Sequence, residues 1–207
     1  MKGAAVPELA LVLYLVYLAL AFGLRSLLQR RRTGSAGFRG TSGRPGSPEW
    51  LGGVLFAVAT LTGLAAPILA LLDVVSPLEP LDASWSGAFG AALAVVGIAC
   101  ALLAQHEMGA SWRIGVDAGE QTQLVTGGIF GVVRNPFFTA SLAVACGLVL
   151  MVPSVVAIGA LIALVVAVEL QVRVVEEPYL LAVQRTTYAA YAQRTGRFLP
   201  GVGRLTV

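Results

Sequence analysis

The chain has few charged residues and few of the residues that bind metals or carry out redox chemistry. Of its 207 residues, 12% are charged, and it has one histidine and two cysteines. His106 begins the sequence HEMGA, which lacks the second histidine that a zinc-protease helix carries four residues later. Cys100 and Cys146 lie inside separate apolar runs, so we interpret both as packing residues. No metal site is expected.

Several common catalytic motifs are also missing. TGGIFG, residues 126–131, is rich in glycine but lacks the spacing of a dinucleotide fingerprint. No lysine follows a glycine loop as a phosphate-binding loop requires, and there is no Gly-x-Ser-x-Gly nucleophile motif. The sequence therefore gives no support to a nucleotide-triphosphate hydrolase or a serine hydrolase.

Apolar residues are abundant instead. They make up 57% of the chain, and the mean hydropathy is +0.82, which is far too high for a soluble domain of this size. The net charge of +3 does not indicate a nucleic-acid-binding protein, because the arginines are confined to segments between apolar runs. Since a spanning helix needs about 20 apolar residues, residues 9–28, 51–75 and 86–104 are predicted to cross a membrane.

The fourth apolar run, residues 137–172, is too long for one span. As a single helix it would measure roughly 54 Å, against about 30 Å for the hydrocarbon core. Pro153 removes a helical hydrogen bond near its middle and Ser154 can cap a new helix, so we expect a hairpin of two short spans. The predicted fold is an all-α integral membrane protein of about five transmembrane helices, the last two forming a helical hairpin.

The positions of the charges predict the orientation. All thirteen arginines fall on one side of the five spans, whereas Lys2, Glu8, Asp73, Glu79 and Asp82 fall on the other. The positive-inside rule then places the N-terminus outside and the arginine side in the cytoplasm. A bacterial inner membrane is the expected location. We divide the chain into a first helix with a basic, flexible loop (1–50), two further spans (51–104) and a core with the hairpin and C-terminal tail (105–207), which would contain the chemistry.

Ionisable residues gather where the last apolar run ends. Glu176 and Glu177 point about 100° apart on a helix, so only one can face the bundle. Glu169, Arg173 and Glu177 are spaced for a ladder of ion pairs along one helix face. Tyr188 lies three residues before Tyr191 on an expected amphipathic helix. Charge neutralisation near the membrane surface would explain the ladder, but boundary ionisable groups are costly enough to favour a functional interpretation.

The order of these motifs resembles the isoprenylcysteine carboxyl methyltransferase family and its bacterial and phospholipid methyltransferase relatives. LVTGGIFGVVRNPFFTASL is followed by the hairpin and then by VRVVEEPYLLAVQRTTYAAYAQRTGRFLP, so the resemblance covers residues 105–200. It implies a membrane methyltransferase that takes S-adenosylmethionine from the cytosol and a lipophilic or small amphiphilic acceptor, with a carboxylate, thiol or amine, from the bilayer. Asn135 and Phe138 stand where many family members have histidine and tyrosine, so the acceptor is left open.

The resemblance also implies roles for individual residues. It assigns a catalytic role to Glu176 and to Arg173, the latter orienting the acceptor. The cofactor-binding positions that it implies are Leu124, Gly128, Arg134, Asn135, Pro136, Glu176, Glu177 and Tyr188. Two alternatives remain at this stage: a membrane reductase that uses NADPH, and a bundle that binds lipid without catalysis.

Overall fold

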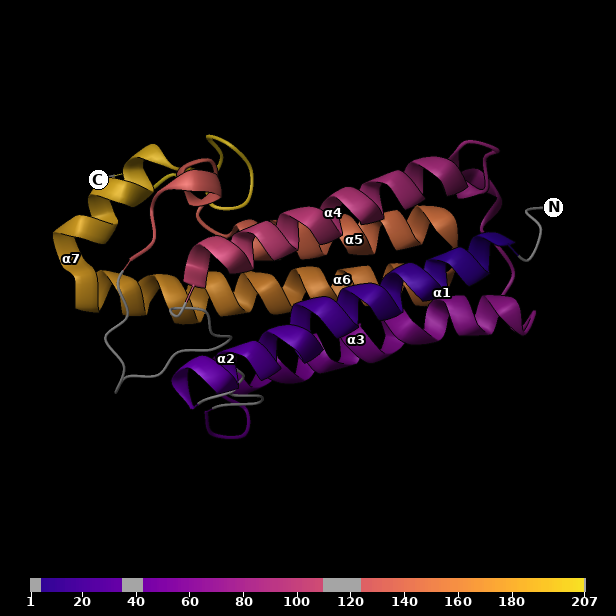
Figure 1. Ribbon diagram of the computed structural model, residues 1–207, viewed down its shortest axis with the longest axis horizontal. Coiled ribbons are helices and arrows are strands. Elements are labelled where there is room, and N and C mark those ends of the chain that lie inside the picture. The colour runs from indigo at the N-terminus through magenta and orange to yellow at the C-terminus, as the bar shows by residue number, and fades with distance from the viewer. Residues whose placement is uncertain (1–4, 35–42, 110–123, 207) are drawn as a thin grey trace.

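The computed structural model describes residues 5–34, 43–109 and 124–206. Within these residues, four helices are long and apolar enough to cross a membrane, and a fifth apolar helix is shorter. The expected all-α membrane bundle is therefore confirmed (Figure 1). Residues 35–42, in the middle of the expected basic loop, and Arg113 lie outside the described residues.

The helices follow one another with few interruptions. Helix α1 (Ala5–Leu18) continues through a π-helical segment, η1 (Ala19–Leu24), into α2 (Arg25–Thr33). Next come α3 (Pro48–Leu71), a 3₁₀ turn η2 (Glu79–Leu81) and α4 (Ser86–Met108). A second 3₁₀ turn, η4 (Gly128–Gly131), precedes α5 (Pro136–Met151) and α6 (Val155–Glu169). The chain then passes through a second π-helical segment, η5 (Leu170–Glu176), into α7 (Glu177–Arg194).

The predicted hairpin is present where the proline and serine placed it. Helix α5 ends at Met151, and α6 begins at Val155, directly after Pro153 and Ser154. The Ser154 Oγ accepts a hydrogen bond of 3.2 Å from the Ala157 amide, which satisfies one of the free N–H groups at the start of α6. The turn therefore forms as the sequence indicated, with Pro153 after the end of α5 and Ser154 as the cap of α6.

The second arm of the hairpin, α6, is followed directly by further helical segments that extend beyond the span. Helical structure continues from Val155 to Arg194, 40 residues with a kink at Arg185, and the part before the kink is about 45 Å long at 1.5 Å per residue, more than the hydrocarbon thickness of about 30 Å. Because the first half is sufficient to cross the membrane, α7 lies beyond the spanning part. Helix α7 bends at Arg185, whose φ of 31° is outside the helical range. Its second half turns back over the end of the bundle (Figure 1).

Small residues bring α4 and α5 into close contact. A Cβ atom added to Gly147 would lie 2.5 Å from the Gly90 carbonyl oxygen, and one added to Gly97 would lie 2.9 Å from the Ala140 carbonyl oxygen. Close approach of backbones through small residues is a usual way for membrane helices to associate. Helix α6 packs mainly on α3, and α1 packs against both α3 and α5.

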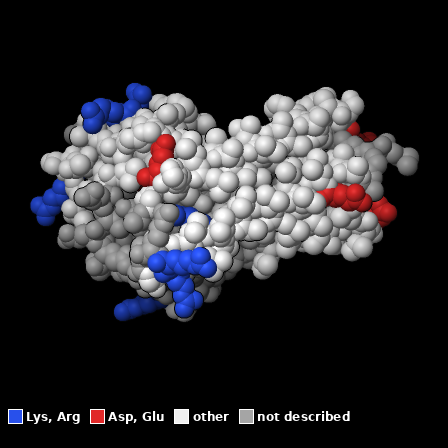
Figure 2. Space-filling model, viewed as in Figure 1, with Lys and Arg blue, Asp and Glu red and all other residues white. Residues whose placement is uncertain are grey.

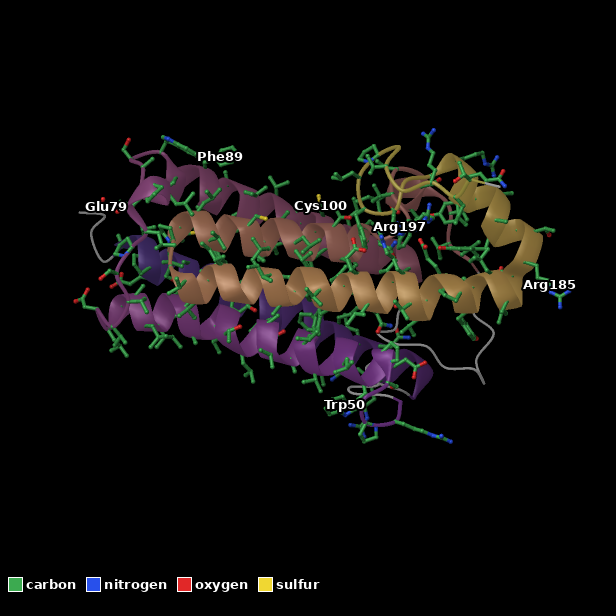
Figure 3. All side chains as sticks on the ribbon, turned by 180° about the vertical axis from the view of Figure 1, so that it is seen from behind. Trp50, Glu79, Phe89, Cys100, Arg185 and Arg197 are labelled. Carbon is green, nitrogen blue, oxygen red and sulfur yellow. The ribbon has the colours of Figure 1, made fainter. Side chains whose placement is uncertain are left out.

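The two ends of the bundle differ in charge. In the view of Figure 2, arginine side chains gather at one end with one acidic patch beside them, and the other end shows only acidic side chains. We call the first the basic end; it contains α2, η4, the start of α5 and α7 (Figure 1). The opposite end carries the hairpin turn and the loop with Glu79 (Figure 3).

Candidate active site

Arg134 is the most highly bonded side chain at the basic end. Its guanidinium is buried and donates to the carbonyl oxygens of Ala192 (3.0 Å), Thr195 (2.5 Å) and Gly203 (3.1 Å). The same group forms an ion pair of 2.5 Å with Glu177. One side chain in the loop before α5 thus holds the end of α7 and the C-terminal tail, residues 195–206.

Glu177 connects Arg134 to a second arginine in the tail. Arg197 donates to both oxygens of the Glu177 carboxylate, at 2.8 and 2.7 Å. Figure 3 shows Arg197 turned toward the start of α5, whereas Arg185 points outward at the bend of α7. Burial of Glu177 opposes its ionisation, but hydrogen bonds and charge from Arg197 and Arg134 outweigh burial, so its pKa is lowered. The carboxylate is therefore ionised and fully used by the two arginines.

The expected ladder from Glu169 through Arg173 to Glu177 is only half present. Arg173 pairs with Glu169 at 2.5 Å on an exposed helix face, whereas Glu177 faces inward to Arg134 and Arg197. The reason is η5, the π-helical segment between Glu169 and Glu177. A π-helical turn contains more residues than an α-turn, so residues eight apart across it no longer share one face.

The two adjacent carboxylates face different surroundings, as their angular separation predicted. Glu177 is buried, and Glu176 is half-buried and accepts a 3.1 Å hydrogen bond from the Gln171 amide. Glu176 also lies close enough to Tyr188 for its charge to help raise the pKa of that phenol. Glu176 therefore lies at the edge of the cluster.

An apolar wall lies beside these charges. Tyr188 and Tyr191 pack edge to face with ring centroids 6.2 Å apart, and Leu124, Leu180 and Leu181 pack against them. The Tyr191 hydroxyl donates to the Phe130 carbonyl oxygen at 2.6 Å, which ties α7 to η4. Burial, and secondarily the charge of Glu177, raise the pKa of Tyr188 to about 12, so its hydroxyl stays protonated and can donate.

Gly128 begins the η4 turn in a conformation that suits glycine. Its φ is +55°, in the left-handed region, and a side chain there would strike the carboxylate of Glu107. Glu107, at the end of α4, accepts a 2.8 Å hydrogen bond from the Ile129 amide. The glycine thus allows a carboxylate to approach the turn closely.

Asn135 and Pro136 join the loop to α5. The Asn135 backbone N–H and its side-chain amide both donate to the Arg197 carbonyl oxygen, at 3.1 and 3.2 Å. Pro136 is the first helical residue of α5, where its missing N–H carries no cost. Thr139 adds a 2.9 Å bond to the Phe198 carbonyl oxygen. Loop and tail are therefore joined along several residues.

A second group of buried polar side chains lies at the same end. The Gln105 side chain donates to the Ala21 carbonyl oxygen at 2.7 Å, and the Arg25 guanidinium donates to the Gly109 carbonyl oxygen. Ala21 lies in the π-helical segment η1, where the usual pattern of backbone bonds is interrupted. These contacts fix α1 and α2 to the end of α4.

The structure brings most of the expected site residues together. Arg134, Glu177, Asn135 and Pro136 meet the tail directly, and Tyr188, Leu124, Gly128 and Glu176 border the same region. Arg173 is the exception, since its side chain is 56% exposed and is paired with Glu169. Sequence reasoning assigned no role to Glu107 or Arg197; for Arg197 the available signal was RFLP, residues 197–200, which ends the second run quoted for the family resemblance.

The comparison with known families supports a single activity. Residues 85–186 match the model of a family described as phospholipid methyltransferase. Over this segment the chain is similar to phospholipid methyltransferases, and the protein is a membrane methyltransferase. As such it uses S-adenosylmethionine and acts on a lipid acceptor. No curated protein and no solved structure matches the chain.

The matched segment of this methyltransferase contains much of the cluster. It runs from the start of α4 through the hairpin to the bend of α7, and so includes Arg134, Glu176 and Glu177. Tyr188 and Arg197, which complete the contacts, lie beyond its end. The assignment favours neither the reductase nor the non-catalytic bundle.

Proposed function

We propose that methyl transfer takes place at the basic end, between the η4 loop, the start of α7 and the tail. The observation that supports this location most directly concerns Arg134. Its Nε–H is buried, and the residues that the structure describes offer it no hydrogen-bond acceptor, although its other nitrogens are bonded. A buried donor without an acceptor is costly, and an anionic group of a ligand would satisfy it.

The residues around Arg134 fit S-adenosylmethionine, which carries an ammonium, a carboxylate, an adenine and a sulfonium. Arg134 Nε and the protonated Tyr188 hydroxyl would hold the carboxylate. Glu176 would bind the ammonium, because Glu177 is already bonded to two arginines. The wall that includes Leu124, Tyr188 and Leu181 offers an apolar surface for the adenine. Gly128 and Asn135 would shape the loop that covers it.

S-adenosylmethionine held by these residues would supply an electrophilic methyl group for transfer to the acceptor, with the sulfonium sulfur as the leaving group. The protein's contribution is then to orient the acceptor and to exclude water. The arginine–carboxylate cluster holds the loop and tail in place over the site. A carboxylate acceptor requires no base, whereas a protonated amine must first lose its proton. Glu176, half-buried at the edge of the cluster, is the carboxylate we assign to receive that proton.

The order of motifs supports placing this protein on the isoprenylcysteine carboxyl methyltransferase side of the family, with a carboxylate acceptor. Asn135 supplies only an amide at the loop, so no histidine is available there to remove a proton. A carboxylate acceptor predicts a rate that is flat between pH 6 and pH 9. A phospholipid amine predicts a rate that rises with pH over the same range, and this result would reject the carboxylate.

Arg173 is proposed to orient the acceptor from outside the cluster. It lies on η5 at the membrane boundary, exposed beside Glu169, where a lipid head group could reach it. The Arg173→Ala variant should therefore weaken acceptor binding and leave cofactor binding unchanged. We also propose that the basic end faces the cytoplasm of a bacterial inner membrane, in accord with the distribution of arginines.

Thermal unfolding in detergent tests the proposed site. S-adenosylhomocysteine should raise the unfolding temperature of the wild type in a saturable way, whereas NADPH should not. Glu176→Gln should weaken the apparent affinity roughly tenfold, the loss of one charged hydrogen bond. Glu169→Gln, which changes an exposed carboxylate on the same helix, is the matched control. Equal affinity in both variants would reject the role of Glu176.

A further inference from the structure

Glu107 lies outside the group of residues proposed above to bind the cofactor, yet it contacts the η4 turn. It stands in the last turn of α4. Its Oε2 atom accepts a 2.8 Å hydrogen bond from the backbone N–H of Ile129, 22 residues further along the chain. The side chain thus joins a transmembrane helix to the loop that contains Gly128, Arg134 and Asn135.

The sequence of the η4 turn explains why it needs a partner from elsewhere. The first N–H groups of a helical turn have no carbonyl partner within it, and a side chain at the N-cap position often accepts from one of them. The N-cap of η4 is Gly127, which has no side chain to do so. Glu107 takes this role from another helix, and a carboxylate acceptor makes the bond stronger than a neutral one would.

The η4 turn is held from two sides. Glu107 binds the Ile129 amide from α4, and the Tyr191 hydroxyl donates to the carbonyl oxygen of the next residue, Phe130, from α7. Gly128 permits this arrangement, because a Cβ atom there would overlap the Glu107 carboxylate. Since different helices fix consecutive residues, the turn cannot shift without breaking one of these bonds.

The last turn of α4 is itself a fixed support. The Gln105 side chain donates to the Ala21 carbonyl oxygen at 2.7 Å, and the Arg25 guanidinium donates to the Gly109 carbonyl oxygen. Gln105 and Arg25 are both buried. A side chain that positions a loop needs a support that does not move with the loop. These two bonds, on either side of Glu107 in the sequence, supply it.

We propose that Glu107 is a positioning residue for cofactor binding, which holds η4 where Gly128 and the following loop cover S-adenosylmethionine. The inference rests on the proposed location of methyl transfer. Glu107 acts through the Ile129 amide and does not touch the cofactor. Without it, the cofactor must order the turn on binding, which lowers its affinity. Binding of the acceptor, assigned to Arg173 on η5, does not depend on this contact.

The test uses three variants and two kinds of measurement. Glu107→Ala removes the acceptor of the hydrogen bond, Glu107→Gln keeps a neutral one, and His106→Ala changes the exposed neighbour on α4 as a matched control. Hydrogen exchange of the Ile129 amide, without any ligand, reports on the turn itself. The affinity for S-adenosylhomocysteine from thermal unfolding, and KM and kcat with an isoprenylcysteine lipid as acceptor, report on the site.

Glu107→Ala should accelerate exchange of the Ile129 amide and weaken the affinity for S-adenosylhomocysteine roughly tenfold, the loss of one charged hydrogen bond. KM for S-adenosylmethionine should rise in the same proportion, while KM for the acceptor should not change. Glu107→Gln should recover most of the affinity and of the exchange protection, because its amide oxygen also accepts a hydrogen bond. His106→Ala should match the wild type in every measurement.

Three results would overturn the inference. Unchanged exchange of the Ile129 amide in Glu107→Ala would show that the turn does not depend on this side chain. Faster exchange with unchanged affinity would show that the turn does not affect the cofactor, and would leave the proposed site intact. Equal loss of affinity in Glu107→Gln and Glu107→Ala would show that the charge itself contacts the cofactor. If S-adenosylhomocysteine does not stabilise even the wild type, the proposed site fails as well.

Discussion

Replacing Glu177 by glutamine should loosen the C-terminal tail without disturbing the transmembrane bundle. The carboxylate is buried, and it holds Arg134 from the loop and Arg197 from the tail. Glutamine has the same shape, but it offers one oxygen instead of two and turns an N–H₂ group toward a guanidinium. One arginine would then be left buried beside a donor.

The size of the effect follows from this geometry. Removing one partner of a buried ion pair costs about 3–5 kcal/mol, and we take the lower limit because glutamine retains one acceptor. At about 1.4 kcal/mol for each factor of ten, a loss of about 3 kcal/mol increases the population of the open tail roughly 100-fold.

Hydrogen exchange of tail amides measures this population. The informative amides are those of Arg197, bonded to the Val202 carbonyl oxygen at 2.7 Å, and Leu205, bonded to the Ala192 carbonyl oxygen at 3.0 Å. Both should exchange roughly 100-fold faster in Glu177→Gln. Glu169→Gln should leave them unchanged, since it breaks only an exposed pair. Equal tail exchange in the wild type and Glu177→Gln would refute the view that this cluster holds the tail.

Three further predictions concern acidity and packing. Because the pKa of Glu177 is lowered from its ordinary 4.5, its stabilising effect is complete above pH 4.5 and is lost as the pH falls through the lower value of the folded state. The hydrogen-exchange rate of the tail amides, corrected for the intrinsic rate, should therefore increase as the pH falls through this value in the wild type. Glu177→Gln should show no such increase. Gly147→Ala should lower stability by about 1–3 kcal/mol in thermal unfolding, because its new Cβ meets the Gly90 carbonyl, whereas Gly159→Ala, with open space around it, should not. Ser154→Ala should cost about 1 kcal/mol in the same assay through loss of the α6 cap.

The hairpin could be predicted because its causes are local. A run too long for the bilayer, with Pro153 and Ser154 at its middle, leaves little choice about where it turns. It could also be expected that Glu176 and Glu177 face different surroundings, since adjacent helical residues point in different directions. The sequence could not show which of the two faces inward, because that depends on arginines that are distant along the chain.

The parts that sequence reasoning missed depend on backbone irregularity and long-range contacts. The π-helical segment η5 carries no sequence signal that we used, yet it separates Arg173 from Glu177. The bond between Glu107 and the Ile129 amide joins residues 22 positions apart. The bend at Arg185 returns Tyr188 toward the loop, although arginine gives no indication of a positive φ.

The most direct test of the account is methyl transfer by the purified protein in liposomes. Radiolabelled S-adenosylmethionine would be supplied outside the membrane, with phosphatidylethanolamine in one sample and an isoprenylcysteine lipid in the other. We expect label in the isoprenylcysteine lipid with the wild type and with Glu169→Gln, and little with Glu176→Gln. Label in neither lipid, or equal transfer by Glu176→Gln and the wild type, would contradict the site proposed at the basic end.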